Sequence, residues 1–367
     1  MSLIARYRHC LPLPPQAPTI SLGEGGTPLV ELIHQSLPDG IRLLVKVEGA
    51  NPTASFKDRG MVVAISAAAA QGVRCVVCAS TGNTSASAAA FAARAEMTCV
   101  VLIPEGKVAT GKIAQAVAHG AEIVQVRGNF DDAMAAVKNI QDDNIAIVNS
   151  INPYRLQGQK TAAFEIIADL GDAPDYHALP VGNAGNITAH WIGYCEATGG
   201  STAACSFCGG NCQLSGHNNM TNKRPVLIGC QAKNAAPFLH NAPVDNPDTI
   251  ATAIRIGNPQ SFTAAKIALQ ESAGWVNAIS DEELLRTQKM LASTEGVFCE
   301  PASAASVAGA LADIANGKIL PPARVVCTLT GHGLKDPEII GAPKVRVVDA
   351  DMATLKQAVM DLSRTRK

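Results

Sequence analysis

Residues 73–105 read VRCVVCASTGNTSASAAAFAARAEMTCVVLIPE. The β-branched runs at 73–80 and 97–105 are typical of buried strands, and the alanine-rich run at 84–95 between them is typical of a helix. A strand, a helix and a second strand at this spacing form a βαβ unit, in which the two strands lie parallel in one sheet. The stretch therefore predicts an α/β fold.

The same alternation extends to both sides of this stretch. Further strands are expected from residues 41, 121 and 145, and further helices over 58–71, 110–118, 130–140 and 157–170. More β-branched runs and helical patterns follow towards the C-terminus. We expect two open, twisted parallel sheets with helices on both faces.

Two domains are the expectation for 367 residues, because single domains usually hold about 100 to 200 residues. The small domain is predicted over 60–150, and the large domain over 1–59 and 151–345. Residues 346–367 are predicted to form a C-terminal extension. The segment 195–224 has almost no apolar periodicity and contains four cysteines, so it is predicted to be an insertion in the large domain.

The amino-acid composition and the net charge limit the kinds of molecule that the protein is expected to bind. Hydrophobic residues make up 47% of the chain and aromatic residues only 4%, as expected for small aliphatic helices packed on parallel strands. The formal net charge of -1 argues against a nucleic-acid or anionic-membrane partner. No window approaches the roughly 18 apolar residues that span a bilayer, and the proline-rich N-terminus does not fit a signal peptide. We expect a cytoplasmic protein with reduced cysteines that acts on a small molecule.

Lys57 lies in the stretch NPTASFKDRGM, residues 51–61, directly before an expected helix. The positive end of the helix dipole disfavours an ammonium group there, and Asp58 in the first turn complements that end. A partly buried lysine so placed is readily held as a neutral amine, the form that a Schiff-base nucleophile needs. The alternative is an ordinary solvated lysine at a helix start.

Three turns of small polar residues follow expected strands: ASTGNTSAS at 79–87, VGNAGNIT at 181–188 and CTLTGHGLKDP at 327–337. The first two open helices, whose free backbone N–H groups can bind an anion. The second lacks the G-x-G-x-x-G spacing of dinucleotide sites and suits a single phosphate. The third places the Thr330 hydroxyl at a strand end, where it can hydrogen-bond a heterocycle nitrogen. Each could instead be an ordinary capped turn.

Eight stretches of the chain together resemble the threonine synthase family of fold-type II pyridoxal-phosphate enzymes. The resemblance runs from about residue 20 to about residue 340, interrupted by the cysteine-rich segment. The stretches are SLGEGGTPL (21–29), EGANPTASFKDRG (48–60), ASTGNTSAS (79–87), VNSINPYRLQGQKT (148–161), VGNAGNIT (181–188), ATAIRIGNP (251–259), EGVFCEPASAAS (295–306) and TLTGHGLKDP (328–337).

The resemblance implies pyridoxal 5′-phosphate as cofactor, bound in the cleft between the two domains. Lys57 would form the Schiff base with it and shuttle protons at the substrate's Cα and Cβ. Asn83 would hydrogen-bond the cofactor's 3′ oxygen, and Thr330 would face the pyridine nitrogen. The cofactor phosphate would be bound by Gly182, Asn183, Ala184, Gly185 and Asn186.

The resemblance also implies the reaction, in which O-phospho-L-homoserine and water give L-threonine and phosphate. The substrate phosphate needs a site apart from that of the cofactor. We expect Thr84, Asn149, Ser150 and Arg155 to form it, because a guanidinium fork with amide and hydroxyl donors suits a phosphate. Without the motif, Arg155 would be read as a member of a surface ion pair. A homodimer is common in the family.

Two rival functions remain from the sequence. The first is another fold-type II reaction, such as threonine or serine dehydration or a cysteate-type synthase. The second is a catalytically silent, metal-dependent interaction protein on the same fold. The joint presence of Lys57, Asn83 and Thr330 argues against the second rival, because only a cofactor requires all three.

The four cysteines of the insertion depart from the family pattern. Cys195, Cys205, Cys208 and Cys212 have the spacing C-x9-C-x2-C-x3-C, and His217 follows. Such a glycine-rich cluster suits a tetrahedral thiolate site for zinc or an iron–sulfur cluster. Unliganded thiols and regulatory disulfides are the alternatives.

Overall fold

The computed structural model describes residues 1–105, 110–127, 137, 142–150, 152–207, 220–341, 345 and 347–363. Contacts within the chain divide it into a large unit, Met1–Asp336, and a small unit, Pro337–Lys367. The small unit contains the helix α13 (Met352–Ser363). In the described part of the chain, no helix is long and apolar enough to cross a membrane.

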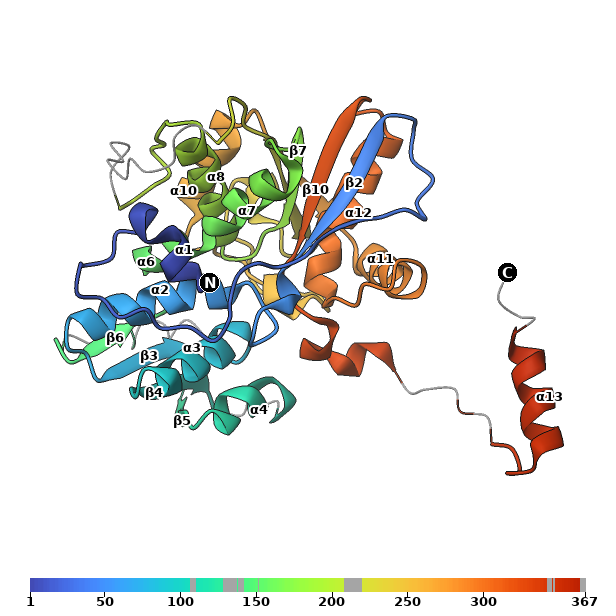
Figure 1. Cartoon of the computed structure of the whole chain (residues 1–367), viewed down its shortest axis with the longest axis horizontal. Coiled ribbons are helices and arrows are strands. Elements are labelled where there is room, and N and C mark those ends of the chain that lie inside the picture. The colour runs from blue at the N-terminus through green and yellow to red at the C-terminus, as the bar shows by residue number, and fades with distance from the viewer. Residues whose placement is uncertain are drawn as a thin grey trace. The chain divides into compact units, whose positions relative to one another are not determined.

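Helices and strands alternate along the large unit (Figure 1). The strands are β1 (Leu29–Glu31), β2 (Ile41–Val47), β3 (Cys75–Ala79), β4 (Thr98–Pro104), β5 (Glu122–Val126), β6 (Ile145–Ile147), β7 (Tyr176–Pro180), β8 (Val226–Ala232), β9 (Trp275–Ile279) and β10 (Ala323–Leu329). The helices are α1 (Leu3–Tyr7), α2 (Lys57–Ala70), α3 (Asn83–Arg94), α4 (Thr110–Ala118), α6 (Pro153–Gln159), α7 (Thr161–Leu170), α8 (Gly185–Ala197), α9 (Pro237–His240), α10 (Phe262–Glu271), α11 (Asp281–Thr294) and α12 (Pro301–Ala315). Short 3-10 turns include η2 (Glu48–Ala50), η3 (Thr252–Ile254) and η4 (Gly333–Lys335).

The strands form two sheets, which confirms the predicted α/β class. The larger sheet has six strands in the order β1-β2-β10-β7-β8-β9. Neighbouring strands of this sheet pair in parallel, except that β1 at the edge runs antiparallel to β2. The smaller sheet has four strands in the order β5-β4-β3-β6, all parallel.

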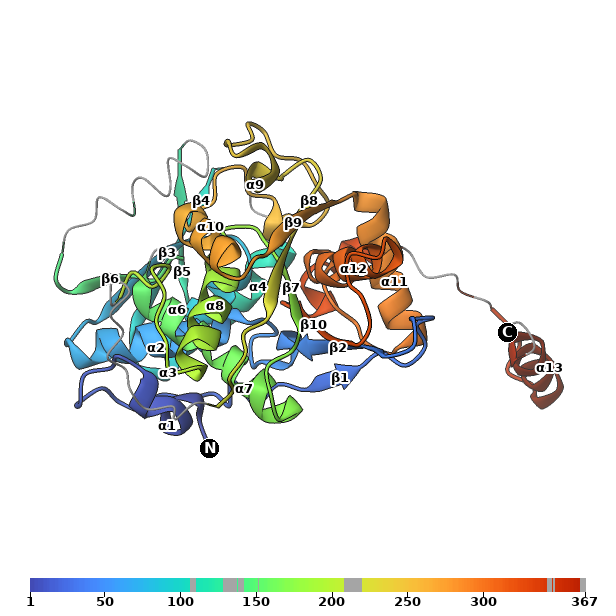
Figure 2. The ribbon, with the colours of Figure 1, turned by 90° about the horizontal axis from the view of Figure 1, so that it is seen from above.

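Helices cover both faces of the six-stranded sheet, as Figure 2 shows with α8 and α10 on one side and α11 and α12 on the other. Successive residues of a strand point to opposite faces. Leu179 and Leu227 accordingly pack in one hydrophobic cluster with Trp191 of α8. Their neighbours Ala178 and Ile228 pack in another cluster, with residues of α12. This two-sided burial is the reason that these strands are apolar throughout.

The four strands of the smaller sheet all lie within the segment predicted to form the small domain. The βαβ unit quoted first, at 73–105, is present as β3, α3 and β4. The helix predicted over 130–140 lies outside the described residues apart from position 137. The predicted helix 157–170 is two helices, α6 and α7, and it begins earlier because the Asn152 side chain caps α6 and Pro153 occupies its first turn. The division of the large unit into two domains stays a prediction.

Candidate active site

The polar turns follow the carboxyl ends of neighbouring parallel strands. In the smaller sheet, β3 leads to the turn at 80–82, and its neighbour β6 leads to Asn149 and Ser150. In the larger sheet, β10 leads to Thr330, and its neighbour β7 leads to the turn at 181–184. Because parallel strands end at the same edge of a sheet, the turns within each pair lie side by side. This is the edge at which open α/β sheets bind ligands.

Lys57 is the first residue of α2 and is half-buried. Its Nζ lies 3.8 Å from the centroid of the Phe56 ring. The Phe56 backbone N–H donates to the Thr330 carbonyl oxygen at 2.9 Å, so the lysine is tied directly to the end of β10. Burial, and then the charge of Arg155, lower the pKa of Lys57 from its usual 10.5 to about 7, while Glu300 opposes this shift. Lys57 can therefore act as a neutral amine near pH 7.

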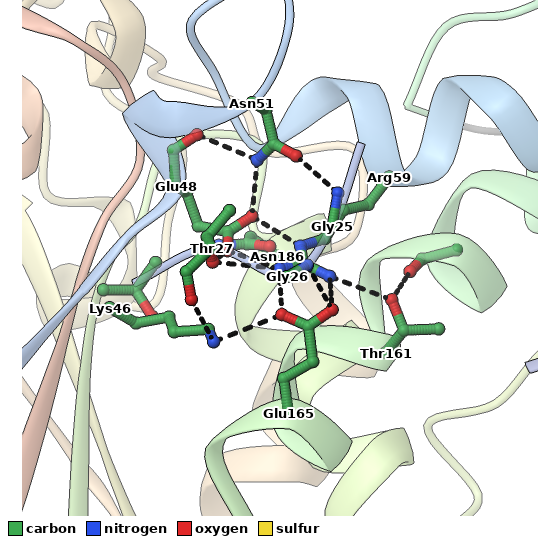
Figure 3. A network of polar contacts seen from close by, with 12 residues as sticks. Gly25, Gly26, Thr27, Lys46, Glu48, Asn51, Arg59, Thr161, Glu165 and Asn186 are labelled. Carbon is green, nitrogen blue, oxygen red and sulfur yellow. Dashed lines mark hydrogen bonds and ion pairs between the residues drawn. The ribbon is translucent and has the colours of Figure 1, made fainter. Parts of the chain in front are cut away.

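A buried ionic network holds the first turns of α2 (Figure 3). The Arg59 Nε donates to Glu48 Oε2 at 2.6 Å, and its Nη2 donates to Glu165 Oε2 at 2.6 Å. All three side chains are buried. Burial alone would raise the pKa of Glu165, but the charge and hydrogen bonds of Arg59 lower it to about 2. Arg59 thus joins α2 to η2 and to α7.

The network continues through Lys46 of β2, which is also fully buried. The Lys46 Nζ lies 3.2 Å from Glu165 Oε2 and donates to the Thr27 carbonyl oxygen at 2.8 Å. The Gly26 N–H donates to Glu165 Oε1 at 2.9 Å. The start of α2, and with it Lys57, is therefore fixed to the larger sheet and to the loop that precedes β1.

A buried carboxyl group, Glu300, connects the two sheets' polar turns. The Asn83 Nδ2 donates to Glu300 Oε2 at 3.1 Å, and the Thr330 Oγ1 lies 3.1 Å from Glu300 Oε1. Asn83 begins α3, which follows the smaller sheet's β3, whereas Thr330 follows β10 of the larger sheet. The structure therefore brings together Lys57, Asn83 and Thr330, the three residues predicted to bind the cofactor's aldehyde and ring.

Sequence reasoning gave Glu300 no role. Glu300 lies within the family-like stretch 295–306, immediately before Pro301 at the start of α12. This position reads as an ordinary helix start, although its side chain makes no capping hydrogen bond. The sequence signal for Glu300 is a carboxylate that lies between an apolar stretch and a proline. Its meaning depends on Asn83, which lies 217 positions away in the chain.

The loop at 181–184 and the start of α8 form a cradle for a small anion. Ala184 has a left-handed backbone with φ 63°, which is uncommon for a residue with a Cβ and marks a conformation imposed by the surroundings. A Cβ on Gly182 would lie 3.0 Å from the Ala253 oxygen and from Ile254 Cα, so only glycine fits there without displacement. The first N–H groups of α8 have no acceptor within the helix and can bind a phosphate.

The two asparagines of this loop have different surroundings. The carbonyl oxygen of Asn183 accepts from Ser261 N at 3.1 Å, which fixes the loop against the start of α10. The Asn186 side chain is buried beside the Arg59 network (Figure 3), and within the described part of the chain its amide has no hydrogen-bond partner. The donor set of the loop fits the phosphate of pyridoxal phosphate.

Arg155 is 1% exposed and has no acidic partner among the residues that the structure describes. Its Nη1 donates to the Val148 carbonyl oxygen at 3.2 Å, and its Nε has no partner in the same set of residues. Burial lowers the pKa of its guanidinium to about 10. Within the described ranges, Arg155 therefore does not form the surface ion pair that is the alternative interpretation of this residue. A buried cation without a counter-ion beside Lys57 is suited to an anionic ligand.

The other three predicted substrate residues lie around the ends of β3 and β6. The Asn149 amide donates to and accepts from the Ala79 backbone at 3.0 Å in both bonds, which leaves it one N–H for a ligand. Ser150 follows it and is half-buried. Thr84, the second residue of α3, is also half-buried.

The structure describes half of the predicted metal cluster. Cys195 and Cys205 are buried and pack in separate hydrophobic clusters. Burial raises the pKa of Cys195 to about 12, which disfavours the thiolate that a metal would bind. Cys208, Cys212 and His217 lie outside the described residues. Within the described ranges, no group of three or more His, Cys, Asp or Glu residues could hold a metal ion.

Comparison with known proteins agrees with this geometry. The family described as pyridoxal-phosphate dependent enzyme matches residues 20–331. Threonine synthase of Mycobacterium tuberculosis is 52% identical over 353 residues, covering 95% of this chain and 93% of that protein. Threonine synthase of Methanocaldococcus jannaschii is 46% identical and covers 97% of this chain and 87% of that protein.

Solved structures share the fold at low sequence identity. Cysteine synthase from Entamoeba histolytica superposes with a TM-score of 0.70 at 19% identity, covering 89% of this chain and 90% of that chain. Maize serine racemase superposes with a TM-score of 0.62 at 19% identity, covering 92% of each chain. With a family match over most of its length and relatives near 50% identity, the chain belongs to the threonine synthases, which are pyridoxal-phosphate-dependent enzymes.

Proposed function

We propose that this pyridoxal-phosphate-dependent lyase converts O-phospho-L-homoserine and water into L-threonine and phosphate. The observation that supports this substrate most directly is Arg155, a buried cation without a carboxylate partner among the described residues, beside Lys57. The cradle at the start of α8 provides one anion site, and Arg155 provides a second. A phosphorylated cofactor and a phosphorylated substrate together require two such sites.

Different residues of the chain are proposed to move protons, orient the cofactor ring and hold the cofactor phosphate. When bound, pyridoxal phosphate supplies an electron sink that stabilises negative charge at the substrate's carbons. Lys57, with its pKa lowered to about 7, can accept a proton from Cα and one from Cβ and return protons at Cγ and Cα. The Cβ hydroxyl comes from water, whose other proton leaves with the phosphate. Asn83 and Thr330 orient the ring from opposite sheets, and the backbone from Gly182 to Asn186 holds the cofactor phosphate.

Four donors are proposed for the substrate phosphate. Arg155 supplies the charge, and Thr84, Ser150 and the remaining N–H of Asn149 fix its orientation. The site lies beside Lys57, whose pKa Arg155 lowers. A phosphate that leaves the substrate is therefore stabilised next to the group that moves the protons.

The experiment is steady-state assay of phosphate release, with threonine identified as product. We expect Arg155→Gln to lower kcat/KM for phosphohomoserine by roughly 100-fold or more, because it removes a buried charge-assisted contact. Arg42→Gln, which removes an exposed guanidinium of the pair with Glu31, is the control. A dehydratase would instead act on serine or threonine, and Arg155→Gln would then affect both substrate classes equally.

The remaining expectations concern the oligomeric state, the domain division and the cellular compartment of the enzyme. We infer a cytoplasmic homodimer of two-domain chains, with the cofactor between residues 60–150 and the rest of the large unit. No disulfide joins any of the nine cysteines within the described ranges, which fits a reducing compartment. Light scattering on the purified protein tests the dimer; a monomeric mass at assay concentration would contradict it.

For the cysteine-rich segment we propose packing thiols at Cys195 and Cys205 in preference to zinc or an iron–sulfur cluster. Their burial in two separate clusters supports this. Metal analysis of the purified protein is the test. About one equivalent of zinc or iron, lost in the Cys195→Ala variant, would contradict the proposal and restore the metal site.

A further inference from the structure

Glu300 is a buried carboxyl group at the centre of the candidate active site that the proposed reaction does not use. It is 1% exposed. A Cβ on Gly331 would lie 2.6 Å from its carboxyl carbon, so the carboxyl group packs directly on the backbone of the turn after β10. The Glu300 backbone N–H also donates to the Gly331 carbonyl oxygen at 3.0 Å. The side chain is thus held in one place.

Its hydrogen-bond partners are neutral. They are the Asn83 amide and the Thr330 hydroxyl, each at 3.1 Å. The charged groups that act on it are Lys57 from α2, Lys335 from η4 and Asp336, and neither lysine hydrogen-bonds the carboxyl in the described part of the chain. A buried carboxylate without a bonded cation is costly, whereas a carboxylic acid is satisfied by one acceptor and one donor. Burial accordingly raises the pKa of Glu300.

Thr330 has one hydroxyl hydrogen and three neighbours that compete for it. Two are protein groups: Glu300 Oε1 at 3.1 Å and Ser303 Oγ at 2.9 Å. Ser303 Oγ already accepts from Gly331 N at 2.9 Å, and its own hydrogen can go to Thr330 Oγ1 at 2.9 Å or to the Gly331 carbonyl oxygen at 3.3 Å, the longer of the two contacts. The third neighbour, under the proposed function, is the cofactor's ring nitrogen.

The protonation of Glu300 decides where that hydrogen points. If Glu300 were ionised, Thr330 would donate to it and could only accept from a protonated ring nitrogen. If Glu300 is a carboxylic acid, it donates to Thr330 Oγ1, and the Thr330 hydrogen is free to donate to an unprotonated ring nitrogen. The second carboxyl oxygen still accepts from Asn83 in both cases.

We propose that Glu300 is a positioning residue for the cofactor: as a carboxylic acid it donates to Thr330, so that Thr330 donates to an unprotonated ring nitrogen. The proposal rests on the proposed function only for the place of the cofactor ring. No proton is transferred; the acid fixes the direction of an existing hydrogen-bond chain. The protein thereby sets how strongly the ring withdraws electrons.

The test is the ¹⁵N NMR shift of the ring nitrogen in holoenzyme reconstituted with ¹⁵N-labelled pyridoxal phosphate. We expect the wild type to show an unprotonated nitrogen near pH 7. Glu300→Gln should keep this shift, because its amide nitrogen can donate to Thr330 while its oxygen accepts from Asn83. A protonated nitrogen in the wild type, or a shift to the protonated position in Glu300→Gln, would overturn the proposal.

A second measurement needs no cofactor. The infrared spectrum of the wild type should contain a carboxylic-acid carbonyl band near pH 7 that Glu300→Gln removes. The matched control is Asp313→Asn on α12, the helix that Glu300 precedes. Asp313 is a buried carboxyl that accepts from Trp275 Nε1 at 2.8 Å and Asn277 Nδ2 at 2.6 Å. The control should leave that band in place. An unchanged acid band in Glu300→Gln would show an ionised Glu300 and overturn the inference.

Glu300→Leu gives the complementary result. It removes the donor to Thr330 and the acceptor for Asn83, so we expect the dissociation constant of pyridoxal phosphate to rise roughly tenfold or more. Asp313→Asn should leave it unchanged, and equal effects of the two variants would contradict a specific role. The NMR and infrared measurements do not depend on catalytic turnover. An enzyme that forms threonine with a protonated ring nitrogen would refute the Glu300 proposal alone.

Discussion

At the scale of single residues, the position of Lys57 combines accessibility with a suppressed charge. The side chain is half-buried at the start of α2, so a ligand can reach it, yet burial and Arg155 lower its pKa to about 7. A lysine on an exposed surface keeps a pKa near its usual 10.5 and is almost wholly protonated in the cell. The structure therefore explains how this amine can be a nucleophile near neutral pH.

Replacing Lys57 by alanine removes the only amine proposed to bind the cofactor covalently. We expect Lys57→Ala to lose the visible absorption band of the protein-bound cofactor and to lower the rate of threonine formation by at least about 1,000-fold. Absorption spectra after gel filtration check the first effect. Lys318→Ala, which removes an exposed lysine that lies 3.9 Å from the Trp275 ring centroid, is the control. A normal visible band in Lys57→Ala would refute the assignment.

The lowered pKa of Lys57 also predicts a dependence of stability on pH in the cofactor-free protein. Between about pH 7 and pH 10.5 the unfolded chain binds a proton at Lys57 that the folded protein does not, so the folded protein gains stability as the pH rises. Lys57→Met lacks this pH-dependent contribution to the free energy of unfolding. We expect Lys57→Met to be more stable than the wild type at pH 7, and the gap to narrow towards pH 10.

Urea unfolding of both proteins at pH 7 and pH 10 measures this gap. Lys318→Met serves as the control for the loss of an exposed lysine. A gap of the same size at both pH values would show that Lys57 is not perturbed in the folded protein.

At the scale of secondary-structure elements, buried ion pairs fix the position of α2. Arg59 is two residues from Lys57 and bonds Glu48 after β2 and Glu165 on α7. Glycines allow the close approach of α6: a Cβ on Gly60 would lie 2.6 Å from the Arg155 carbonyl oxygen, and one on Gly158 would lie 1.9 Å from that of Arg59. The helices α2 and α6 therefore place Lys57 and Arg155 in a fixed relation.

Breaking the network should destabilise the protein strongly. We expect Arg59→Met to lower the free energy of unfolding by about 3–5 kcal/mol, because it removes the guanidinium that pairs with two buried carboxylates, Glu48 and Glu165, and leaves Glu165 with Lys46 alone. The matched control is Arg42→Met, which breaks the exposed pair with Glu31 and should change the free energy by less than about 1 kcal/mol. Urea unfolding of the cofactor-free proteins measures both; similar values would contradict the structural role of the network.

At the scale of the whole molecule, every residue proposed for catalysis and for binding lies in the unit Met1–Asp336. The unit Pro337–Lys367 contains α13, on which Leu355 and Val359 are exposed. The two sheets of the large unit meet at the active site through Glu300, which bonds Asn83 from one and contacts Thr330 from the other.

This separation predicts that the C-terminal helix is dispensable for chemistry. We expect a chain that ends at Gly341 to bind pyridoxal phosphate and form threonine at rates within about threefold of the full chain, since it keeps the complete large unit. Absorption spectra and the threonine assay measure this. The full-length chain is the reference, and loss of cofactor binding on truncation would contradict the prediction.

The sequence by itself determined the local structure and its chemistry. Strand and helix periodicity predicted β2, β3, β4 and α2, α3 and α4, because the pattern of buried positions is local. The family-like stretches predicted roles for Lys57 and for the loop at 181–184, because glycines and donors at a helix start have their effect within a few residues.

Only the tertiary structure decided which distant groups meet and what charge each carries. The contact of Glu300 with Asn83 spans 217 positions, and the Arg59–Glu165 pair spans 106. Without the family-like motif, Arg155 would be interpreted as a surface residue. The packing of α6 on α2 buries it, and no acidic partner lies beside it among the described residues. Protonation depends on burial and on charges from other elements, which a local pattern does not contain.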